Sequence, residues 1–347
     1  MKRITLLFAA AICLFTGCQK TIKQLATPQA TGTPYDLYIV APPHMEFGSL
    51  KDTIEAVLAT PMQWTPNGDP HFRLRYLTTD NFKSSIIRTV GNVVYLNISS
   101  DNAQEPSIRI ERDTYAESQI IAKMYAQTPD DLAQYLPQHA PQLRDLFTRV
   151  ELNRAVRLLK TDFCSKECDR LMQLQEVSMK IPEDLSTPGL GKDSLFFWCT
   201  NNAFKKRCDI VVYSIPYTDA KVFSLEGAVA VRDSIMKQNI ESDGAGSYMT
   251  TNRKYVLPEY QALNIGGQYV GELKGMWRIE NGLMAGPFVC HIRLDEANQR
   301  VVFAEGFVYA PNDEKRNSIR RLEAALYTLQ LPSDNMSPEI EITFEQP

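Results

Sequence analysis

The most constraining feature of this sequence is an order of strand and helix signals that occurs twice in its second half. Short apolar or alternating runs bounded by turn residues predict strands, and apolar residues three or four apart predict helices. The first stretch comprises predicted strands at 175–181, 195–200 and 207–214, a helix at 220–239 and a strand at 247–251. The second comprises predicted strands at 268–279, 284–294 and 300–310, a helix at 313–330 and a strand at 339–345. Strands joined by short turns favour antiparallel sheets with helices packed on one side. The sequence therefore predicts an α+β fold in which a β-β-β-α-β unit is a candidate repeat.

The first half of the chain predicts strands alternating with helices. Its expected strands lie at 36–42, 71–79, 92–99 and 107–112. Its expected helices lie at 49–60, with Ser49 as the N-cap, at 115–126, at 129–136 and from Pro141 to about Leu174. The segment 182–194 is rich in proline, glycine and serine and is the best internal linker. We therefore expect an N-terminal α/β region with a long helix over 35–181 and a C-terminal α+β region over 182–347.

The N-terminus has the pattern of an export signal. Lys2 and Arg3 precede an apolar run of about a dozen residues, which is too short to cross a bilayer and fits a signal peptide. Thr16, Gly17 and Cys18 follow it, and this order resembles the bacterial lipobox. The resemblance implies a lipoprotein signal peptide at 1–17, cleaved before a lipidated Cys18. A plain signal peptide with a chance cysteine and a buried N-terminal helix are the alternatives.

Residues 18–34 predict a flexible tether, because they are rich in Thr, Gln, Ala and Pro and have no apolar period. The tether lacks an acidic cluster after Cys18, and Gln19 is not the aspartate that holds some lipoproteins at the inner membrane. By that resemblance we expect a protein of the bacterial cell envelope. It would be anchored in the outer membrane through Cys18 and face the periplasm, where an envelope protein is a candidate partner.

The composition excludes some classes of function. The chain has 37 basic and 41 acidic residues, a net charge of −4, and loss of 1–17 would remove two basic residues and no acidic ones. A mildly acidic protein lacks the basic face that nucleic-acid binding requires. No second long apolar run follows the first, so we expect a soluble body.

Five cysteines remain beyond Cys13 and Cys18, so at least one stays free or pairs elsewhere. Cys199 and Cys208 lie on two predicted strands joined by a polar turn and are a candidate disulfide. Cys164 and Cys168 lack further ligands nearby, so the sequence predicts no metal site and no cofactor.

The sequence contains no recognisable catalytic motif. The segment GLGKDS at 189–194 has Ser186 and Asp193 where a phosphate-binding loop needs glycine and Ser or Thr, so we reject that interpretation. The four histidines form no close ligand pair. We therefore assign no catalytic residue, although a triad could still assemble from distant positions.

The segment 271–294 predicts a glycine-rich hairpin that turns at 280–282. Pro287 cannot donate a ladder hydrogen bond, which predicts an edge or a bulge in its strand. An irregular edge beside Trp277 and Arg278 predicts a binding groove. The alternative is a strongly twisted sheet with Trp277 in its core.

The predicted helix at 313–330 follows Asn312, a residue suited to cap it. Lys315 and Arg316 crowd its first turn, together with Arg320 and Arg321. Cations at a helix N-terminus are locally unfavourable, so they form a candidate surface for phosphate, carboxylate or an acidic partner. A solvent-exposed face is the alternative.

Several segments together resemble a family of uncharacterised bacterial envelope lipoproteins: the glycine-flanked Trp277 strand, MAGPFV, VYAP followed by EKRNSIRRLEAALYT, RDSIMKQNI, SYMTT and FFWCT. The resemblance covers most of residues 35–345 and implies no catalytic residues. Our leading hypothesis is a non-enzymatic binding or assembly factor. An envelope hydrolase or sugar-acting enzyme with a scattered active site, and a small-ligand carrier, are the alternatives.

Overall fold

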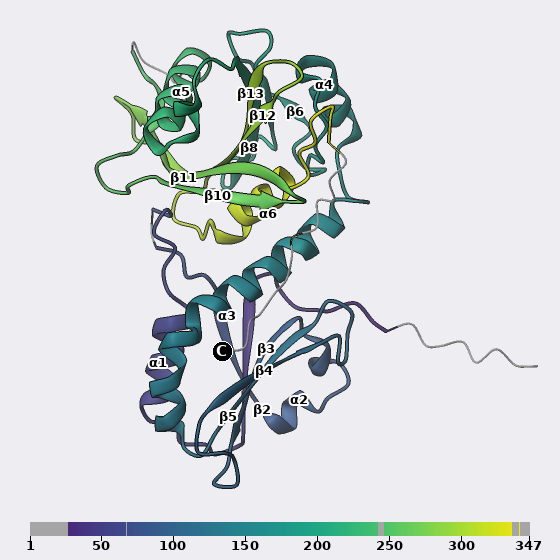
Figure 1. Ribbon diagram of the computed structural model, residues 1–347, viewed down its shortest axis with the longest axis vertical. Coiled ribbons are helices and arrows are strands. Elements are labelled where there is room, and N and C mark those ends of the chain that lie inside the picture. Colours follow the sequence, from purple (N-terminus) through teal and green to yellow (C-terminus); the bar gives the residue numbers. More distant parts are fainter. Residues whose placement is uncertain (1–26, 67, 242–245, 335–339, 341–347) are drawn as a thin grey trace, which may run out of the picture.

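A computed structural model describes residues 27–66, 68–241, 246–334 and 340 of the chain. Cys18, the signal peptide at 1–17 and the predicted strand at 339–345, except Ile340, lie outside the described residues. Two sheets, each with its own helices, lie one beyond the other along the longest axis of the molecule (Figure 1). The α+β class is confirmed. Within the described ranges, no helix has the length and apolar character needed to cross a bilayer.

The first sheet has the strand order β2-β1-β3-β5-β4. Its strands are β1 (Asp36–Ala41), β2 (Arg73–Thr78), β3 (Asn92–Ile98), β4 (Ser107–Arg112) and β5 (Ile120–Ala126). Only β4 runs antiparallel to its neighbour, so this sheet is mainly parallel rather than antiparallel. Neighbouring parallel strands require a crossover connection. The chain passes from β1 to β2 through α1 (Ser49–Leu58), and from β2 to β3 through α2 (Thr79–Phe82) and the short helix η1 (Ile87–Thr89).

The predictions for 115–126 and for the start of the helix at 49–60 are wrong. Residues 115–126 contain strand β5 rather than a helix, because its apolar residues are buried on both faces of a parallel sheet and show no alternation. Gly48, and not Ser49, occupies the N-cap of α1, and the Ser49 hydroxyl donates to Asp130 at 2.9 Å.

A long helix, α3 (Pro129–Leu158), covers the first sheet together with α1 and continues to the second sheet (Figure 1). Its 30 residues span about 45 Å. Thr128 and Asp131 form a capping box at its start, so the helix begins at Pro129 and not at Pro141. It ends at Leu158, and α4 (Ser165–Gln175) is a separate helix.

The second sheet is antiparallel throughout, in the order β10-β11-β12-β13-β8-β7-β6, with β9 paired to β11. Its strands are β6 (Thr187–Pro188), β7 (Phe197–Thr200), β8 (Arg207–Pro216), β9 (Tyr248–Thr251), β10 (Glu259–Ile265), β11 (Gln268–Glu280), β12 (Ala285–Asp295) and β13 (Arg300–Tyr309). The two β-β-β-α-β stretches thus contribute to one sheet. Residues 175–181 form no strand beyond a single bridge from Ser178 to Gln330, and β10 was not predicted.

Helices cover both faces of the second sheet, and not one face only. The helix α5 (Leu225–Asn239), preceded by the short helix η2 (Ala220–Phe223), packs on the face that carries Trp277 and Phe303. The opposite face, with Phe197 and Val302, is covered by α4 and by α6 (Arg316–Leu326).

The change from one core to the other falls directly after α3. Leu171, Val177 and Ile181, which we placed in the N-terminal region, pack in the same core as Phe197 of the second sheet. Leu185, inside the predicted linker at 182–194, is fully buried in that core as well. Apolar packing therefore ties residues 165–185 to the second sheet.

Candidate functional site

A cavity of about 640 Å³ lies between the two sheets. This volume is within the usual range for small-molecule sites, which occur preferentially where two domains meet. The first part of the chain contributes residues 30–36, Tyr38, Gly91, Asn92 and one face of α3 at Glu151, Arg154, Ala155 and Leu158. The second part contributes Asp184, Asn201, Lys206, Cys208, Asn317, Ser318, Arg320 and Arg321.

One wall of the cavity is the segment that leads into β1. Ala30 donates its backbone N–H to Glu117, and Thr31 exchanges backbone hydrogen bonds with Thr89 and Gly91 at 2.9 Å each. These bonds fasten residues 29–31 to the segments that lead into β3 and β5 of the first sheet. The end of the predicted flexible tether is therefore an ordered part of the cavity wall.

On α3, the cavity wall contains an ion pair between Arg154 and Glu151, and all three guanidinium nitrogens of Arg154 donate hydrogen bonds. Arg154 Nη1 donates to Glu151 at 2.6 Å and to Asn92 Oδ1 at 2.9 Å, and its other nitrogens donate to the carbonyls of Gly91 and Ser118. Burial lowers the pKa of Arg154, while the Glu151 carboxylate opposes that shift. This pair holds α3 against β3, so we assign it a structural role.

Three polar side-chain atoms of other lining residues, in contrast to those of Arg154, have no hydrogen-bond partner within the described residues. They are Tyr35 Oη, Asp36 Oδ1 and Arg320 Nε. The three residues are only 4%, 3% and 5% exposed. Leaving a buried polar atom unpaired costs about 1–3 kcal/mol, so these three residues of the cavity lining each carry an uncompensated polar atom.

The remaining atoms of these groups are anchored. Asp36 Oδ2 accepts a hydrogen bond from Arg75 Nε at 3.1 Å, and Arg320 Nη1 donates to Glu323 at 2.7 Å. Burial raises the pKa of Tyr35 well above its usual value, so its phenol is neutral and can donate. The three unpaired atoms are therefore two donors, on Tyr35 and Arg320, and one acceptor, on Asp36.

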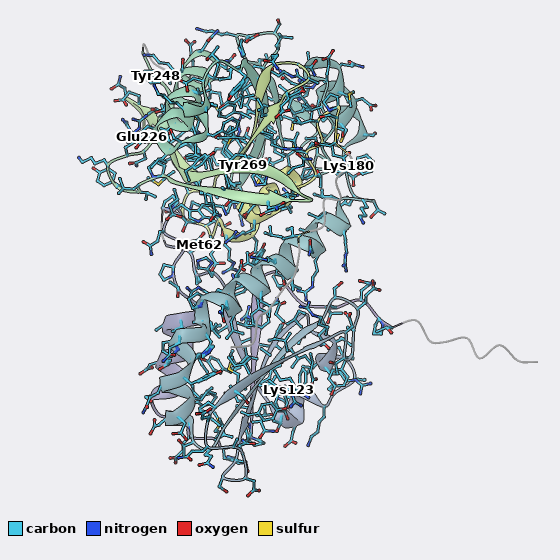
Figure 2. All side chains as sticks on the ribbon, viewed as in Figure 1. Met62, Lys123, Lys180, Glu226, Tyr248 and Tyr269 are labelled. Atoms are coloured by element: carbon cyan, nitrogen blue, oxygen red, sulfur yellow. The ribbon has the colours of Figure 1, made fainter. Side chains whose placement is uncertain are left out.

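The cavity depends on close docking of the two parts of the chain. Asp69, in the loop between α1 and β2, accepts hydrogen bonds from the backbone N–H groups of Lys315 and Arg316 at 2.6 and 3.0 Å. A carboxylate from the first part thus caps α6, and Asn312, which has a φ of 60°, does not. Met62 of the same loop lies at the junction in Figure 2 and belongs to the second core.

The residues predicted to form a binding surface are not brought together. Trp277 is 1% exposed and donates its Nε1–H to the Val308 carbonyl at 3.2 Å, so the alternative with Trp277 in the core is what the structure has. Arg278 forms an ion pair with Glu280. Lys315 and Arg316 are buried, with their backbone N–H groups bonded to Asp69.

The predicted edge in the hairpin is also absent. β12 lies between β11 and β13, and Pro287 stands opposite Met276 inside the sheet. A groove beside Trp277 would need a free edge at this position, and the paired strands exclude one.

The candidate disulfide does not form. Cys199 and Cys208 are buried free thiols, because the register of β7 and β8 places Ile210 opposite Cys199. Within the described ranges, no group of three or more His, Cys, Asp or Glu side chains is arranged to hold a metal ion.

Comparisons with known proteins divide the chain in the same way as its packing. Residues 30–160 match a family described as Domain of unknown function (DUF8532). Residues 165–328 match a family described as Domain of unknown function (DUF4837). Each part of the chain matches a family of unknown function. This confirms the expected resemblance to uncharacterised proteins.

Two further comparisons add little. No curated protein matches the chain. A crystal structure from Bacteroides thetaiotaomicron VPI-5482 at 1.50 Å resolution aligns at 14% identity with a TM-score of 0.24. The alignment covers 46% of this chain and 46% of that one, so the chain spans less than half of that protein.

Proposed function

We propose that the protein is a non-enzymatic binding protein of the bacterial cell envelope that holds a ligand in the cavity between its two sheets. The observation that carries this proposal is the cavity of about 640 Å³, whose lining includes Tyr35, Asp36 and Arg320, three residues with an unpaired polar atom. Asp36 and Arg320 are held by other hydrogen bonds, which is how a preformed site keeps its geometry without ligand.

A scattered hydrolase site is the second candidate, and Asp36 is the observation that favours it. Its buried carboxylate has one unpaired oxygen, which is the state a general base needs. Two further carboxylates line the cavity: Glu151 on α3 is engaged by Asn92 and Arg154, and Asp184 is engaged by Arg321. Cys208 and Ser318 also line the cavity, but burial raises the pKa of the Cys208 thiol, which opposes nucleophilic reactivity. Binding without catalysis is therefore the better-supported function.

The proposed lipid anchor would place the cavity close to the membrane. Pro28 lies ten positions after Cys18, and ten residues of chain span at most about 36 Å. The segment 30–34 that follows is part of the cavity wall. We therefore propose an outer-membrane protein that faces the periplasm and exchanges its ligand with the membrane or with an envelope protein.

The anchor is tested by changing Cys18→Ser. We expect the variant to leave the membrane fraction or to remain uncut, because a mature lipoprotein is held by its acyl chains. Fractionation followed by intact-mass measurement would check this. A variant that is still cut and lipid-modified would contradict the assignment.

Binding in the cavity is tested by filling it. Ala155 lies on the cavity face of α3, whereas Gln142 lies on an exposed face of the same helix. We expect wild-type protein and Gln142→Trp, purified from the native host, to release the same small molecule on organic extraction. Ala155→Trp should release none, as measured by mass spectrometry. Equal recovery from all three would exclude the cavity as the binding site.

A further inference from the structure

We propose that Cys164 and Cys168, at the start of α4, form a reversible disulfide, so that this turn is a redox-active site of the protein. The pair follows the end of α3, where the chain passes from the first core to the second. This inference goes beyond the proposed binding function and does not depend on the cavity. It is carried by the backbone geometry of the turn, by the contacts of both cysteines with Ile181 and by their exposure.

The start of α4 directs the two side chains towards each other. Residues four apart inside a helix have parallel Cα–Cβ bonds, which suit a disulfide poorly. Cys164, however, is the N-cap of α4, with an extended backbone at φ −79° and ψ 95°, and its thiol accepts no capping hydrogen bond. A side chain at such an N-cap folds over the first turn towards the N2 and N3 amides, whereas the Cα–Cβ bond of Cys168 tilts back towards the helix N-terminus. The two side chains therefore converge.

The separation of the two cysteines also fits the bond. The backbone N–H of Cys168 donates to the carbonyl of Cys164 at 3.1 Å, which closes the first turn of α4. Four residues advance about 6 Å along a helix, and a disulfide joins residues whose Cα atoms are about 4.4–6.8 Å apart. Rotation of the two side chains, with at most a small shift of the N-cap, can therefore join the sulfur atoms.

Ile181 contacts both cysteines. The backbone N–H of Cys164 donates to the Ile181 carbonyl at 2.9 Å, and the Ile181 N–H donates to Sγ of Cys168 at 3.4 Å. One residue thus holds the backbone of the first cysteine and the sulfur of the second. Ile181 is itself fully buried in the core of the second sheet. The core therefore fixes the geometry of the turn in advance, as a preformed site requires.

Access from the solvent distinguishes this pair. Cys164 and Cys168 are partly exposed, and Cys168 also lines a groove of about 380 Å³ beside α4. The other cysteines within the described ranges are buried: Cys199, Cys208 and Cys290. An oxidant in solution can therefore reach the pair in the folded protein, whereas the buried thiols are shielded from it.

The oxidant is a disulfide, carried by a thiol oxidoreductase or by glutathione. The Cys164 thiolate attacks one of its sulfur atoms, which forms a mixed disulfide and releases the other sulfur as a thiolate. The Cys168 thiolate then attacks Sγ of Cys164, which forms the internal disulfide and releases the second sulfur of the oxidant. Two electrons thus pass to the oxidant, and its two thiolates take up the two protons that the cysteines lose.

This order follows from the surroundings of Cys168. Burial raises the pKa of the Cys168 thiol, and the Ile181 N–H and the charge of Lys180 oppose that shift only in part. Because the thiolate is the reactive form, Cys164 is expected to meet the oxidant first. The proposed envelope location would supply oxidants of this class, although the test needs only glutathione.

The test equilibrates the purified full chain with reduced and oxidised glutathione, alkylates the remaining thiols and digests the protein with trypsin. Lys166 lies between the two cysteines, so trypsin separates 161–166 from 167–170, and a Cys164–Cys168 disulfide joins these two peptides. We expect mass spectrometry to find the joined peptides as the main form in oxidised glutathione and the separate alkylated peptides after return to reduced glutathione. If Lys166 stays uncut, the oxidised peptide that spans both cysteines carries no alkyl group.

Two variants test the assignment. Cys164→Ser should abolish the joined peptides and leave Cys168 open to alkylation. Cys199→Ser, which changes a buried thiol of β7, should leave them unchanged. Thermal unfolding gives a second measurement. The oxidised wild type should unfold at a higher temperature than the reduced one, because the bond constrains the unfolded chain, and Cys164→Ser should show no such difference.

The inference is overturned if both cysteines remain open to alkylation in oxidised glutathione, if each is joined to glutathione instead of to the other, or if Cys168 pairs with a different cysteine. These outcomes leave the proposed function untouched, because Ala155→Trp and extraction of the ligand test the cavity separately.

Discussion

Two buried clusters of polar side chains differ in how completely their hydrogen bonds are formed. Beneath α5, Arg232 donates to both oxygens of Glu305 at 2.8 and 2.7 Å and to Thr251 at 3.0 Å. Its guanidinium also lies 3.8 Å from the ring centre of Phe288. Both charged side chains are fully buried, and they satisfy each other without help from any other molecule.

The polar side chains Tyr35, Asp36 and Arg320 in the cavity wall are buried to a similar degree, but their hydrogen bonds are not all formed. Tyr35, Asp36 and Arg320 each keep one polar atom without a partner in the described part of the chain. The comparison shows that burial of charge alone does not indicate function. A complete cluster stabilises the fold, whereas an incomplete one leaves the cost of its unpaired polar atoms uncompensated.

The largest effect is expected from Glu305→Ala in the complete cluster. This change leaves the Arg232 charge buried and unpaired, which should lower the free energy of unfolding by about 3–5 kcal/mol. Urea unfolding followed by circular dichroism would measure it. Glu241→Ala is the control, because its ion pair with Lys192 is exposed and should contribute less than about 1 kcal/mol. Similar losses in both variants would contradict the distinction.

A pH effect is expected from His71, next to the incomplete cluster. Its pKa in the folded protein is about 3, below the ordinary value of 6.5, so the unfolded chain binds more protons between these two pH values. The stability associated with neutral His71 is therefore present above pH 6.5 and lost as the pH falls towards 3.

The slope of this loss should reach about 1.4 kcal/mol per pH unit, and His71→Gln should remove it. The difference between wild type and variant, measured by unfolding across this pH range, isolates His71 from the carboxylates that titrate there. Parallel curves would mean that burial, and after it the charges of Arg320, Arg144, Lys274 and Arg316, do not lower the pKa of His71 this far.

The smallest effect on stability is expected from Tyr35→Phe. Removing a buried hydroxyl that has no partner takes away an unpaired polar atom, so the free energy of unfolding should stay the same or rise by about 1 kcal/mol. Tyr213→Phe should behave alike, because its hydroxyl is also unpaired. Thermal unfolding of both variants tests this. A clear loss of stability in Tyr35→Phe would show that its hydroxyl is bonded within the protein, and the cavity wall would then be complete.

Much of the fold could be predicted from local pattern. The strands of the hairpin at 271–294 and the helix over 220–239 were expected within a few residues of where they lie. Predictions failed where periodicity carries no information. β5 is buried on both faces, and β10 lies at an edge where most of its side chains are partly exposed.

The candidate site was largely beyond prediction. Trp277 and the cations Lys315 and Arg316 were noticed for their residue types, yet their partners decide what they do. Val308 holds the indole, and Asp69, far away in the sequence, caps α6. Of the cavity residues, Arg320 and Arg321 had drawn attention as cations at the start of a helix, and Cys208 as one half of a candidate disulfide.

The sequence by itself determined the α+β class, most strands and helices of both sheets and the resemblance to families of unknown function, because these depend on periodicity and on short motifs. Only the tertiary structure decided which polar groups are satisfied. Tyr35 and Asp36 begin the first strand and Arg320 lies in the last described helix, and they share one cavity because α3 and the Asp69 loop dock the two sheets together. Hydrogen bonding and burial are properties of such non-local contacts, so no local pattern in the chain could reveal them.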